Sequence, residues 1–318
     1  PKATDPLVGT VFADKYQILK VLGSGGMSVI YQARHKYMER ICAVKLLHPF
    51  LLQDAAMFQR FQYEAKAAST LNHPNVVGVH DFGITSDGRA YLVMDYLSGE
   101  DLSSILEREI ILPEPQAREI FRQACLGLDH AHSKGVIHRD LKPSNLFLEP
   151  QEDNTIIVKL VDFGIARLYQ DEGDNTHVVS QGYSPPEQYW GGADPRSDIY
   201  ALGATMYFLL TGKEPLALTV SAPRNDDEEI SEATDLIVQR ATQQDVYLRY
   251  QSAADMKEEL DYVFQGEDKT KPSFRWLELV VGVLVTFLSV GAWFAYSKFV
   301  EMRNDTEIQK NDLSQEKL

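Results

Sequence analysis

The sequence predicts an α+β protein built from two lobes and followed by one membrane-spanning helix. Residues 1–97 alternate short β-rich runs, such as "YQILKVLG" and "AYLVMDYL", with one helical stretch, "QDAAMFQRFQYEAKAASTL". Over residues 98–265 the runs become helical, and stretches such as "SDIYALGATMYFLLTG" stop at a glycine. We therefore expect a small, mainly antiparallel lobe at 1–97 and a larger, α-rich lobe at 98–265.

One segment near the C-terminus differs from the rest because it has no charged residue. It reads "LVVGVLVTFLSVGAWFAYS" and covers nineteen residues, 279–297. At about 1.5 Å per residue its length approaches the roughly 30 Å hydrocarbon core of a bilayer. A buried core helix is the alternative, but the segment is apolar on every face and follows the last globular motif. We expect a transmembrane helix at 276–297, after a juxtamembrane linker at 266–275 and before a short polar tail at 298–318.

The charge balance argues against one large class of partners. The chain has 46 Asp and Glu residues against 31 Lys and Arg residues, a formal charge of −15, so most of its surface repels nucleic acid. We expect no nucleic-acid binding. The two cysteines, Cys42 and Cys125, lie in apolar surroundings and not at metal-ligand spacing, which favours buried thiols in a reducing compartment.

A glycine-rich stretch, "LGSGGMSVIY", lies between two β-rich runs. Glycine lets backbone N–H groups approach phosphate oxygens without a Cβ in the way. Alone this is weak evidence, because such a hairpin is often only a turn, and Ser28 stands where a G-x-G-x-x-G pattern has its third glycine. Further on, Lys45 lies in the apolar run "ICAVKLL", where an unpaired ammonium is costly. Glu64, on the following helical stretch, is its expected partner, and an ordinary solvated helix charge is the alternative.

The stretch "VIHRDLKPSNLFL", at 136–148, is a more specific signal. Asp140 and Asn145 are five residues apart, with Lys142 between them. A carboxylate can accept a hydroxyl proton, a lysine can meet the transferring phosphate, and an amide oxygen can hold Mg²⁺. These residue types at this spacing indicate phosphoryl transfer.

In chain order, the glycine-rich loop, the strand lysine, "HRDLKPSN", "VDFGIA" and "SPPEQY" resemble a protein kinase. The likeness covers residues 14–265, and the chain is similar to the eukaryotic-type (Hanks-type) serine/threonine protein kinases of bacteria. The resemblance implies the two-lobed protein kinase fold. It also implies transfer of the γ-phosphoryl group of ATP to Ser or Thr hydroxyls of protein substrates, with Mg²⁺ as the metal and Mn²⁺ as an alternative.

The tripeptide Asp-Phe-Gly occurs twice, beginning at Asp81 and at Asp162. In the kinase order the metal-binding copy follows the catalytic loop, which fits Asp162. The earlier copy precedes that loop and lies between two β-rich runs. We therefore expect Asp81 to be structural, at the end of a strand.

The resemblance implies a role for each residue that matches a family motif. For catalysis, Asp140 is the base, Lys142 and Lys45 contact phosphates, Glu64 pairs with Lys45, and Asn145 and Asp162 hold the metal. The implied nucleotide contacts are Leu22, Gly23, Ser24, Gly25, Gly26, Met27, Ser28, Val29, Ile30, Ala43, Lys45, Met94, Asp95, Leu97 and Phe147. Within this set, Val29, Ala43 and Phe147 sandwich adenine, Met94 is the gatekeeper, and the backbone of Asp95 and Leu97 forms the hinge.

The implied activation segment reads "DFGIARLYQDEGDNTHVVSQGYSPPE". Thr176, its only threonine, is the candidate for autophosphorylation, and Arg139, beside the base, is a partner for the phosphate. A plain polar loop residue is the alternative for Thr176. Ser180 stands where the family usually has a threonine, and its hydroxyl would position substrate against Asp140.

Three further residues are implied as structural supports. Arg249 is the buried partner of Glu187, and Asp198 braces the backbone of the catalytic loop. The stretch between "LTGKEP" and Arg249 is short for the family, which puts a substrate-docking region in doubt.

We expect an active, membrane-anchored kinase. The alternative is a pseudokinase, a scaffold that uses the fold for binding only and transfers no phosphate. The complete set of catalytic residues favours the active kinase. Basic residues are balanced on the two sides of the expected membrane helix, so its orientation follows only from the need for ATP. We expect a single-pass protein of the inner (plasma) membrane with a cytoplasmic kinase domain. Gly282 and Thr286, four residues apart, could let two such helices pack, which makes a homodimer a candidate.

Overall fold

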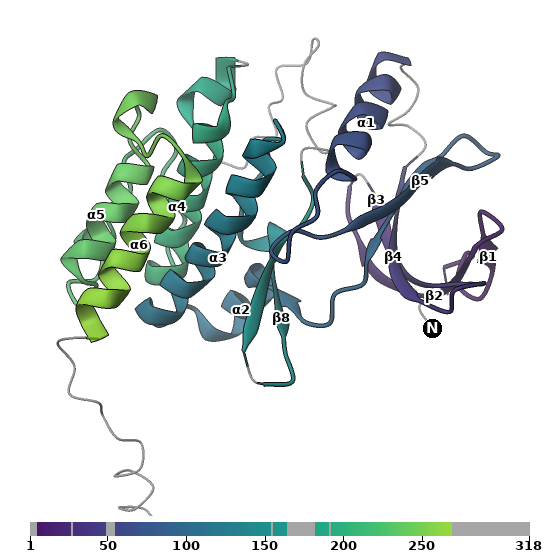
Figure 1. Cartoon of the computed structure of the whole chain (residues 1–318), viewed down its shortest axis with the longest axis horizontal. Coiled ribbons are helices and arrows are strands. Elements are labelled where there is room, and N and C mark those ends of the chain that lie inside the picture. Colours follow the sequence, from purple (N-terminus) through teal and green to yellow (C-terminus); the bar gives the residue numbers. More distant parts are fainter. Residues whose placement is uncertain are drawn as a thin grey trace, which may run out of the picture. The chain divides into compact units, whose positions relative to one another are not determined.

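The computed structural model divides the chain into two compact units, Pro1–Phe264 and Gln265–Leu318. The described residues are 5–26, 28–48, 55–153, 155–163, 182–190 and 192–268. The fold and the site below belong to the first unit, in which a β-rich lobe and a helical lobe follow each other in sequence (Figure 1).

The N-terminal lobe is a six-stranded antiparallel sheet with the strand order β1-β2-β3-β4-β6-β5. The strands are β1 (Val11–Phe12), β2 (Tyr16–Ser24), β3 (Ser28–His35), β4 (Ile41–Leu47), β5 (Val79–Ile84) and β6 (Ala90–Asp95). Helix α1, Ala55–Ala68, follows β4 in the chain and contacts β5 (Figure 1).

The register between β3 and β4 decides which side chains share a face. Ile30 pairs with Lys45, and Gln32 pairs with Ala43. Because successive side chains of a strand point to opposite faces, Ile30, Ala43 and Lys45 lie on one face of the sheet. Val29 lies on the other face, where it packs against the core of the lobe.

The core of the N-terminal lobe is made of buried side chains from several strands. Ile18, Ala33 and Val44 are almost completely buried there. Phe12 of β1 meets Tyr91 of β6 edge to face, with ring centroids 5.0 Å apart. This aromatic contact stabilises the attachment of the short edge strand β1.

The C-terminal lobe is mainly helical and includes a small three-stranded sheet, ordered β7-β8-β9. The helices are α2 (Leu102–Glu109), α3 (Glu114–Ser133), α4 (Pro195–Thr211), α5 (Glu232–Ala241) and α6 (Ala253–Asp268), and the strands are β7 (Glu100–Asp101), β8 (Leu146–Pro150) and β9 (Ile156–Leu160). Helices α3 and α4 pack against each other, and Phe121, Leu128 and Leu202 are fully buried in the core that they share.

Helix α4 is capped at both ends, and the cap at its N-terminal end fixes its first turn. The Asp194 carboxylate and the Ser197 hydroxyl form a capping box, and the helix ends at Gly212, whose φ of 67° places it in the left-handed region that favours glycine. Asp198, in the first turn, is completely buried. The caps therefore hold a buried carboxylate in a defined place.

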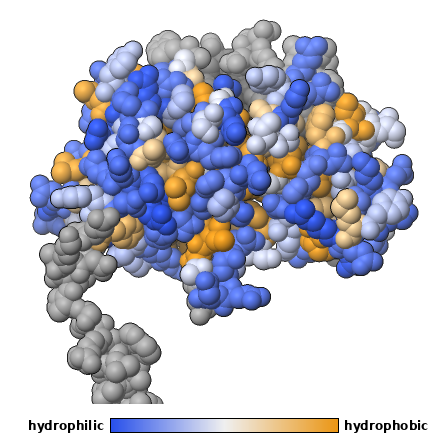
Figure 2. All heavy atoms as spheres, viewed as in Figure 1, coloured by the Kyte–Doolittle hydropathy of each residue, from blue (hydrophilic) through white to orange (hydrophobic). Residues whose placement is uncertain are grey.

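The surface of the described chain is mainly hydrophilic on the face shown in Figure 2, with hydrophobic residues scattered over it. Scattered apolar side chains are normal for a folded domain.

The predicted two-lobed α+β fold is confirmed by these elements. The stretch noted as short in the sequence, 216–248, is described throughout and contains α5 and two three-residue 3₁₀ helices, Pro223–Asn225 and Val246–Leu248. No helix in the described part of the chain is long and apolar enough to cross a membrane. The membrane helix expected at 276–297 and the tail at 298–318 lie outside the described residues, as does the linker beyond residue 268.

Candidate active site

A cavity of about 380 Å³ lies beside β3, β4 and the chain that follows β6. Its volume is typical of a small-molecule site. The lining residues are Leu22, Gly23, Ile30, Ala43, Val77, Met94, Asp95, Tyr96, Leu97, Gly99, Asp101, Ser144, Phe147, Val161 and Asp162. Apolar side chains from both lobes dominate this lining, with a few polar groups among them, as a bound nucleotide base would need.

For one of the three residues predicted to sandwich adenine, Val29, the prediction is wrong. Ala43 and Phe147 line the cavity, but Ile30 lines it instead of Val29. The register explains the correction, because Ile30 shares a face with Ala43 while Val29 faces the core of the lobe. Both residues are apolar and β-branched, so the hydrophobic pattern cannot distinguish them. The register that pairs Ile30 with Lys45 distinguishes them, and a single sequence does not display it.

The glycine-rich loop closes the hairpin between β2 and β3. The backbone N–H of Gly25 donates to the carbonyl of Ser28 at 2.9 Å. A Cβ added at Gly25 or at Gly26 would meet nothing within 4 Å, so the space beside these backbone positions is open. Leu22, Gly23 and Ser24 belong to β2, and Ser28, Val29 and Ile30 belong to β3. Met27 lies outside the described residues.

Lys45 forms an ion pair with Asp162 across 117 positions of sequence. Its Nζ lies 2.6 Å from Asp162 Oδ1, and the lysine side chain is only 12% exposed. The pair therefore supplies the partner that a nearly buried ammonium requires. Glu64, the partner expected from the sequence, belongs to α1, but its side chain lies outside the described residues.

Asp162 has an unusual backbone and a perturbed carboxyl group. Its φ of 61° is rare for a residue other than glycine. Burial acts to raise the pKa of the carboxyl, but the charge and the hydrogen bond of Lys45 outweigh it and hold the pKa below its ordinary value. The next residue, Phe163, is buried, and its ring centroid lies 4.6 Å from that of His138. The carboxylate is thus kept ionised beside a turn that is fixed by packing.

Asp140 lies between an amide and an ammonium. Asn145 Nδ2 donates to the backbone carbonyl of Asp140 at 2.6 Å and to Asp140 Oδ2 at 3.1 Å. Lys142 Nζ lies 2.9 Å from the same Oδ2. Because the NH₂ group of Asn145 faces Asp140, its amide oxygen is the atom that can turn to a cation.

Asp198 binds the backbone of the catalytic loop, as the resemblance implied. Its Oδ1 accepts from the N–H of Arg139 at 2.7 Å, and its Oδ2 accepts from the N–H of His138 at 2.8 Å. His132 Nε2, on α3, lies 2.8 Å from the same Oδ2. Sequence reasoning missed His132, because no local pattern connects α3 to the first turn of α4.

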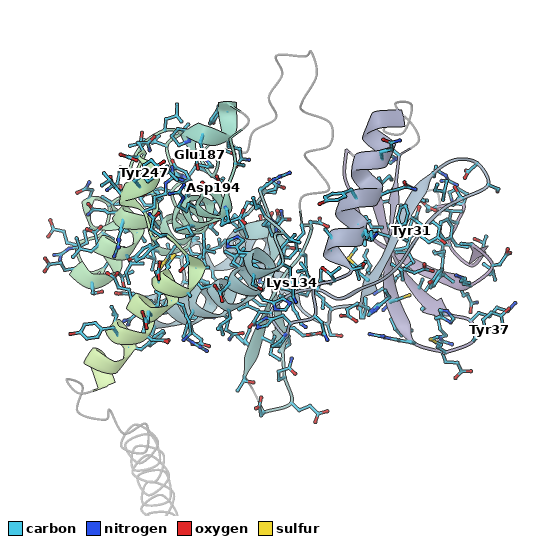
Figure 3. The ribbon with its side chains drawn as sticks, turned by 45° about the horizontal axis from the view of Figure 1, so that its top comes forward. Tyr31, Tyr37, Lys134, Glu187, Asp194 and Tyr247 are labelled. Atoms are coloured by element: carbon cyan, nitrogen blue, oxygen red, sulfur yellow. The ribbon has the colours of Figure 1, made fainter. Side chains whose placement is uncertain are left out.

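Glu187 and Arg249 form the pair that the resemblance implied. Two guanidinium nitrogens of Arg249 lie 2.7 and 2.9 Å from the two carboxylate oxygens of Glu187. Arg249 is almost completely buried, and Ser197 donates its hydroxyl to the same carboxylate at 2.7 Å. Figure 3 shows Glu187 near Asp194, the N-cap of α4. The pair therefore ties the short 3₁₀ helix Pro186–Trp190 to the core of the lobe.

The Glu187 carboxyl should make the stability of the protein depend on pH. Burial acts to raise its pKa, but the hydrogen bonds from Arg249 and Ser197 outweigh it and hold the pKa below the usual 4.5. A carboxyl with a depressed pKa stabilises the fold above its unfolded pKa, and this contribution is lost as the pH falls through the folded pKa. We expect the free energy of unfolding, measured with denaturant, to fall below about pH 4.5. The fall should be shallower in Glu187→Gln, and an equally steep fall would contradict this assignment.

The expected hinge contains a cluster of polar contacts that sequence reasoning missed. Met94, the expected gatekeeper, is buried and lines the cavity. The Asp95 carboxylate accepts from the backbone N–H of Gly78 at 3.0 Å and lies 2.7 Å from His80 Nε2. Arg40 also reaches it, at 2.5 Å. Burial acts to raise the pKa of Asp95, but His80, Gly78 and Arg40 outweigh it and keep the pKa below its ordinary value. The Asp95 carboxylate therefore links the hinge to Gly78 and His80, at the start of β5.

The earlier Asp-Phe-Gly copy is structural in its contacts. Asp81 lies within β5, and its Oδ2 accepts from the Tyr16 hydroxyl at 2.7 Å and from Lys15 Nζ at 3.3 Å. It does not line the cavity. Asp81 therefore links β5 to the start of β2, although it lies inside the strand and not at its end.

Two expected site residues, Thr176 and Ser180, lie outside the described residues. Within the ranges that the structure describes, no group of three or more His, Cys, Asp or Glu side chains could hold a metal. The donor set that the resemblance implies consists of one carboxylate, Asp162, and one amide, Asn145, and Mg²⁺ in such sites takes its other ligands from phosphates and water.

Comparison with known proteins shows one family, and the similar proteins named below are kinases of that family. The model of the protein kinase domain matches residues 16–278. The serine/threonine-protein kinase pkn3 of Myxococcus xanthus is 38% identical over 283 residues, which covers 82% of this chain and 52% of that protein. The serine/threonine-protein kinase PknB of Mycobacterium leprae is 37% identical over 281 residues, 82% of this chain and 44% of that protein. The chain thus spans about half the length of these relatives.

Solved structures show the same fold. The kinase domain of PknI from Mycobacterium tuberculosis matches with a TM-score of 0.68 and 27% identity, over 80% of this chain and 98% of that one. A structure of Rad53 residues 1–466 in complex with AMP-PNP matches with a TM-score of 0.62 and 26% identity, over 77% of this chain and 64% of that one.

Proposed function

Since the chain belongs to the protein kinase family, we propose that it transfers the γ-phosphoryl group of ATP to Ser or Thr hydroxyls of proteins. The observation that carries the proposal is that two pairs of side chains lie next to each other. Lys45 pairs with Asp162 on the cavity wall, and Asn145 is hydrogen-bonded to Asp140. The backbone carbonyl of Asn145 accepts from the N–H of Val161, the residue before Asp162, at 3.1 Å. These are the residue types that phosphoryl transfer requires, namely a phosphate-binding cation, metal-binding oxygens and a base.

The side chains of the catalytic loop would orient the acceptor and move one proton. Asp140 would accept the proton of the attacking hydroxyl, and Lys142, 2.9 Å from that carboxylate, would face the phosphate that is transferred. Lys45 would hold the phosphates of the nucleotide, with Asp162 keeping its ammonium in place. Catalysis on this account comes from positioning and from compensation of charge.

The residues present fit a divalent cation, Mg²⁺ or, as an alternative, Mn²⁺. Asp162 is held ionised by Lys45, and the amide oxygen of Asn145 is the hard ligand that Mg²⁺ accepts. When bound with ATP, the ion supplies charge neutralisation to the phosphates. Asp162 and Asn145 would hold it.

Ser or Thr is the proposed acceptor class for two reasons. Lys142 stands two residues after Asp140, as in serine/threonine kinases and not as in tyrosine kinases. The curated relatives are also named serine/threonine-protein kinases. Thr176 is the proposed site of autophosphorylation, with Arg139 as the partner of its phosphate, and Ser180 is proposed to position the substrate.

Anchoring of the kinase to the inner membrane is a further part of the proposal. It is supported by the uncharged run within 276–297, which has the length of a bilayer span. A cytoplasmic kinase domain follows from the need for ATP, and a homodimer through the membrane helices is a candidate assembly. Recovery of the full-length chain in the soluble fraction of cells, without detergent, would contradict this part.

The proposed function is tested by incubating the purified full-length chain with Mg²⁺, γ-labelled ATP and a generic protein acceptor. We expect label on Ser and Thr residues, identified by phosphoamino-acid analysis, and its loss when Mg²⁺ is chelated. Mapping the labelled sites of the chain itself would test Thr176. Nucleotide binding without any transfer would favour the alternative, a pseudokinase scaffold.

A further inference from the structure

The backbone just before the catalytic base has a conformation that needs support. Arg139 has a φ of 67°, in the left-handed region that is strained for a residue with a Cβ. Asp198 holds the N–H groups of His138 and Arg139. These N–H groups belong to the two peptide units that precede the unit joining Arg139 to Asp140.

The next two carbonyl groups are held by side chains. The carbonyl of Arg139 accepts from Gln188 Nε2 at 2.8 Å. The carbonyl of Asp140 accepts from Asn145 Nδ2 at 2.6 Å. The Cα of Asp140 therefore lies between two peptide units whose carbonyl oxygens are both fixed. Asn145 belongs to the catalytic loop itself, whereas Gln188 comes from another element.

Gln188 is itself on a firmly attached segment. It belongs to the 3₁₀ helix Pro186–Trp190, next to Glu187. Glu187 is bonded to the buried Arg249 and to Ser197 at the start of α4. The amide of Gln188 thus reaches the catalytic loop from a segment that is fixed to the core of the lobe.

We infer that Gln188 is a positioning residue for Asp140. By donating to the carbonyl of Arg139, it sets the plane of the peptide unit that carries the N–H of Asp140. The direction of the Asp140 side chain depends on that plane. Gln188 does not line the cavity, so it acts through the backbone and touches no reacting atom. The inference rests on the proposed function, because it assigns a role toward the proposed base.

Gln188 also connects the implied activation segment with the loop that carries Asp140. The segment that contains Gln188 begins at Gly182, whose φ of 93° and close approach to Pro215 leave no room for a Cβ. In the same segment Tyr183 donates its hydroxyl to Glu214 at 2.9 Å. The last part of the implied activation segment is therefore docked on the loop after α4, and Gln188, which follows it, extends this docking to the base.

The test uses a substitution that removes the donor and changes little else. Methionine has nearly the shape of glutamine, is uncharged and cannot donate a hydrogen bond. In the full-length chain we expect Gln188→Met to lower kcat about 10- to 100-fold, since a small misplacement of a catalytic group has effects of this size. The KM for ATP and the midpoint of thermal unfolding should stay close to those of the unchanged chain.

A matched control distinguishes loss of this bond from loss of any glutamine. Gln151 makes the same kind of bond, from its Nε2 to the carbonyl of Glu149 at 3.2 Å, in the turn after β8. We expect Gln151→Met to leave kcat unchanged. Gln188→Glu, which places an acceptor against the same carbonyl, should lower kcat at least as much as Gln188→Met.

Three results would overturn the inference. One is a kcat of Gln188→Met within twofold of the unchanged chain. Another is a raised KM for the protein acceptor at unchanged kcat, which would make Gln188 a substrate contact. The third is a fall in kcat that only follows a fall in the folded fraction. If the unchanged chain itself transfers no phosphate, the proposed function fails and this inference fails with it, whereas an active chain with an unimpaired Gln188→Met overturns the inference alone.

Discussion

Replacing Asp140 by Asn is expected to lower kcat by about 10²- to 10⁴-fold, the usual contribution of a general base. The amide is close in shape to the carboxylate, so the contacts of Asn145 and Lys142 with this position should be partly preserved. What is lost is the group that accepts the hydroxyl proton. The measurement is the steady-state rate of label transfer to a protein acceptor at saturating ATP.

Asp129 offers the matched control for this substitution. It is exposed on α3 and does not line the cavity. We expect Asp129→Asn to keep the full rate. A rate for Asp140→Asn within a few-fold of the unchanged chain would remove Asp140 from the chemistry, even if the chain is a kinase.

Replacing Arg249 by Met is expected to cause the largest loss of stability among single substitutions of the supports. Arg249 is completely buried and is bonded to Glu187 and to the carbonyl of Gln243 at 2.7 Å. Removing it takes away the cation that is hydrogen-bonded to the mostly buried Glu187 carboxylate. Breaking a buried ion pair on one side costs about 3–5 kcal/mol, to be measured by denaturant unfolding at pH 7.

Two comparisons make this prediction sharper. The exposed pair of Arg108 and Glu100 provides a control, because surface ion pairs contribute about 0–1 kcal/mol. We expect Arg108→Met to stay within that range. The double variant Arg249→Met with Glu187→Gln should recover part of the loss, since it leaves no unpaired charge. A double variant that is less stable than Arg249→Met would contradict the account.

Much of the candidate site was predictable because its residues lie in short motifs with a fixed order. The catalytic loop, with Asp140 and Asn145 five residues apart, needs only one turn of chain to bring its groups together. Asp162 was separated from Asp81 by its place after that loop, and the contacts agree with this choice. The pairing of Glu187 with Arg249 was predictable only through the family resemblance, since the two are 62 positions apart.

The remaining features depend on contacts that no local pattern specifies. Val29 and Ile30 are equivalent in hydrophobicity, and only the register with β4 decides that Ile30 lines the cavity. Lys45 has a choice of carboxylates, and the ion pair that the structure describes joins it to the other lobe. The contacts of Asp95 with Arg40 and of Gln188 with Arg139 connect segments that are distant in sequence. Each is set by tertiary packing, which a single sequence does not display.

The central claim is that the copy of Asp-Phe-Gly at Asp162, and not the one at Asp81, serves phosphoryl transfer. The two copies form a built-in comparison, since the same change can be made in both. Asp162→Asn would remove a proposed metal ligand and the charge that pairs with Lys45. Asp81→Asn retains an oxygen that can accept from the Tyr16 hydroxyl.

The most direct measurement is Mg²⁺-dependent label transfer from ATP by the full-length chain carrying each substitution. We predict that Asp162→Asn lowers the rate by about 10²-fold or more, because several kcal/mol of charge stabilisation are lost. Asp81→Asn should keep a rate close to that of the unchanged chain. Equal rates for the two variants, or a larger loss in Asp81→Asn, would contradict the account.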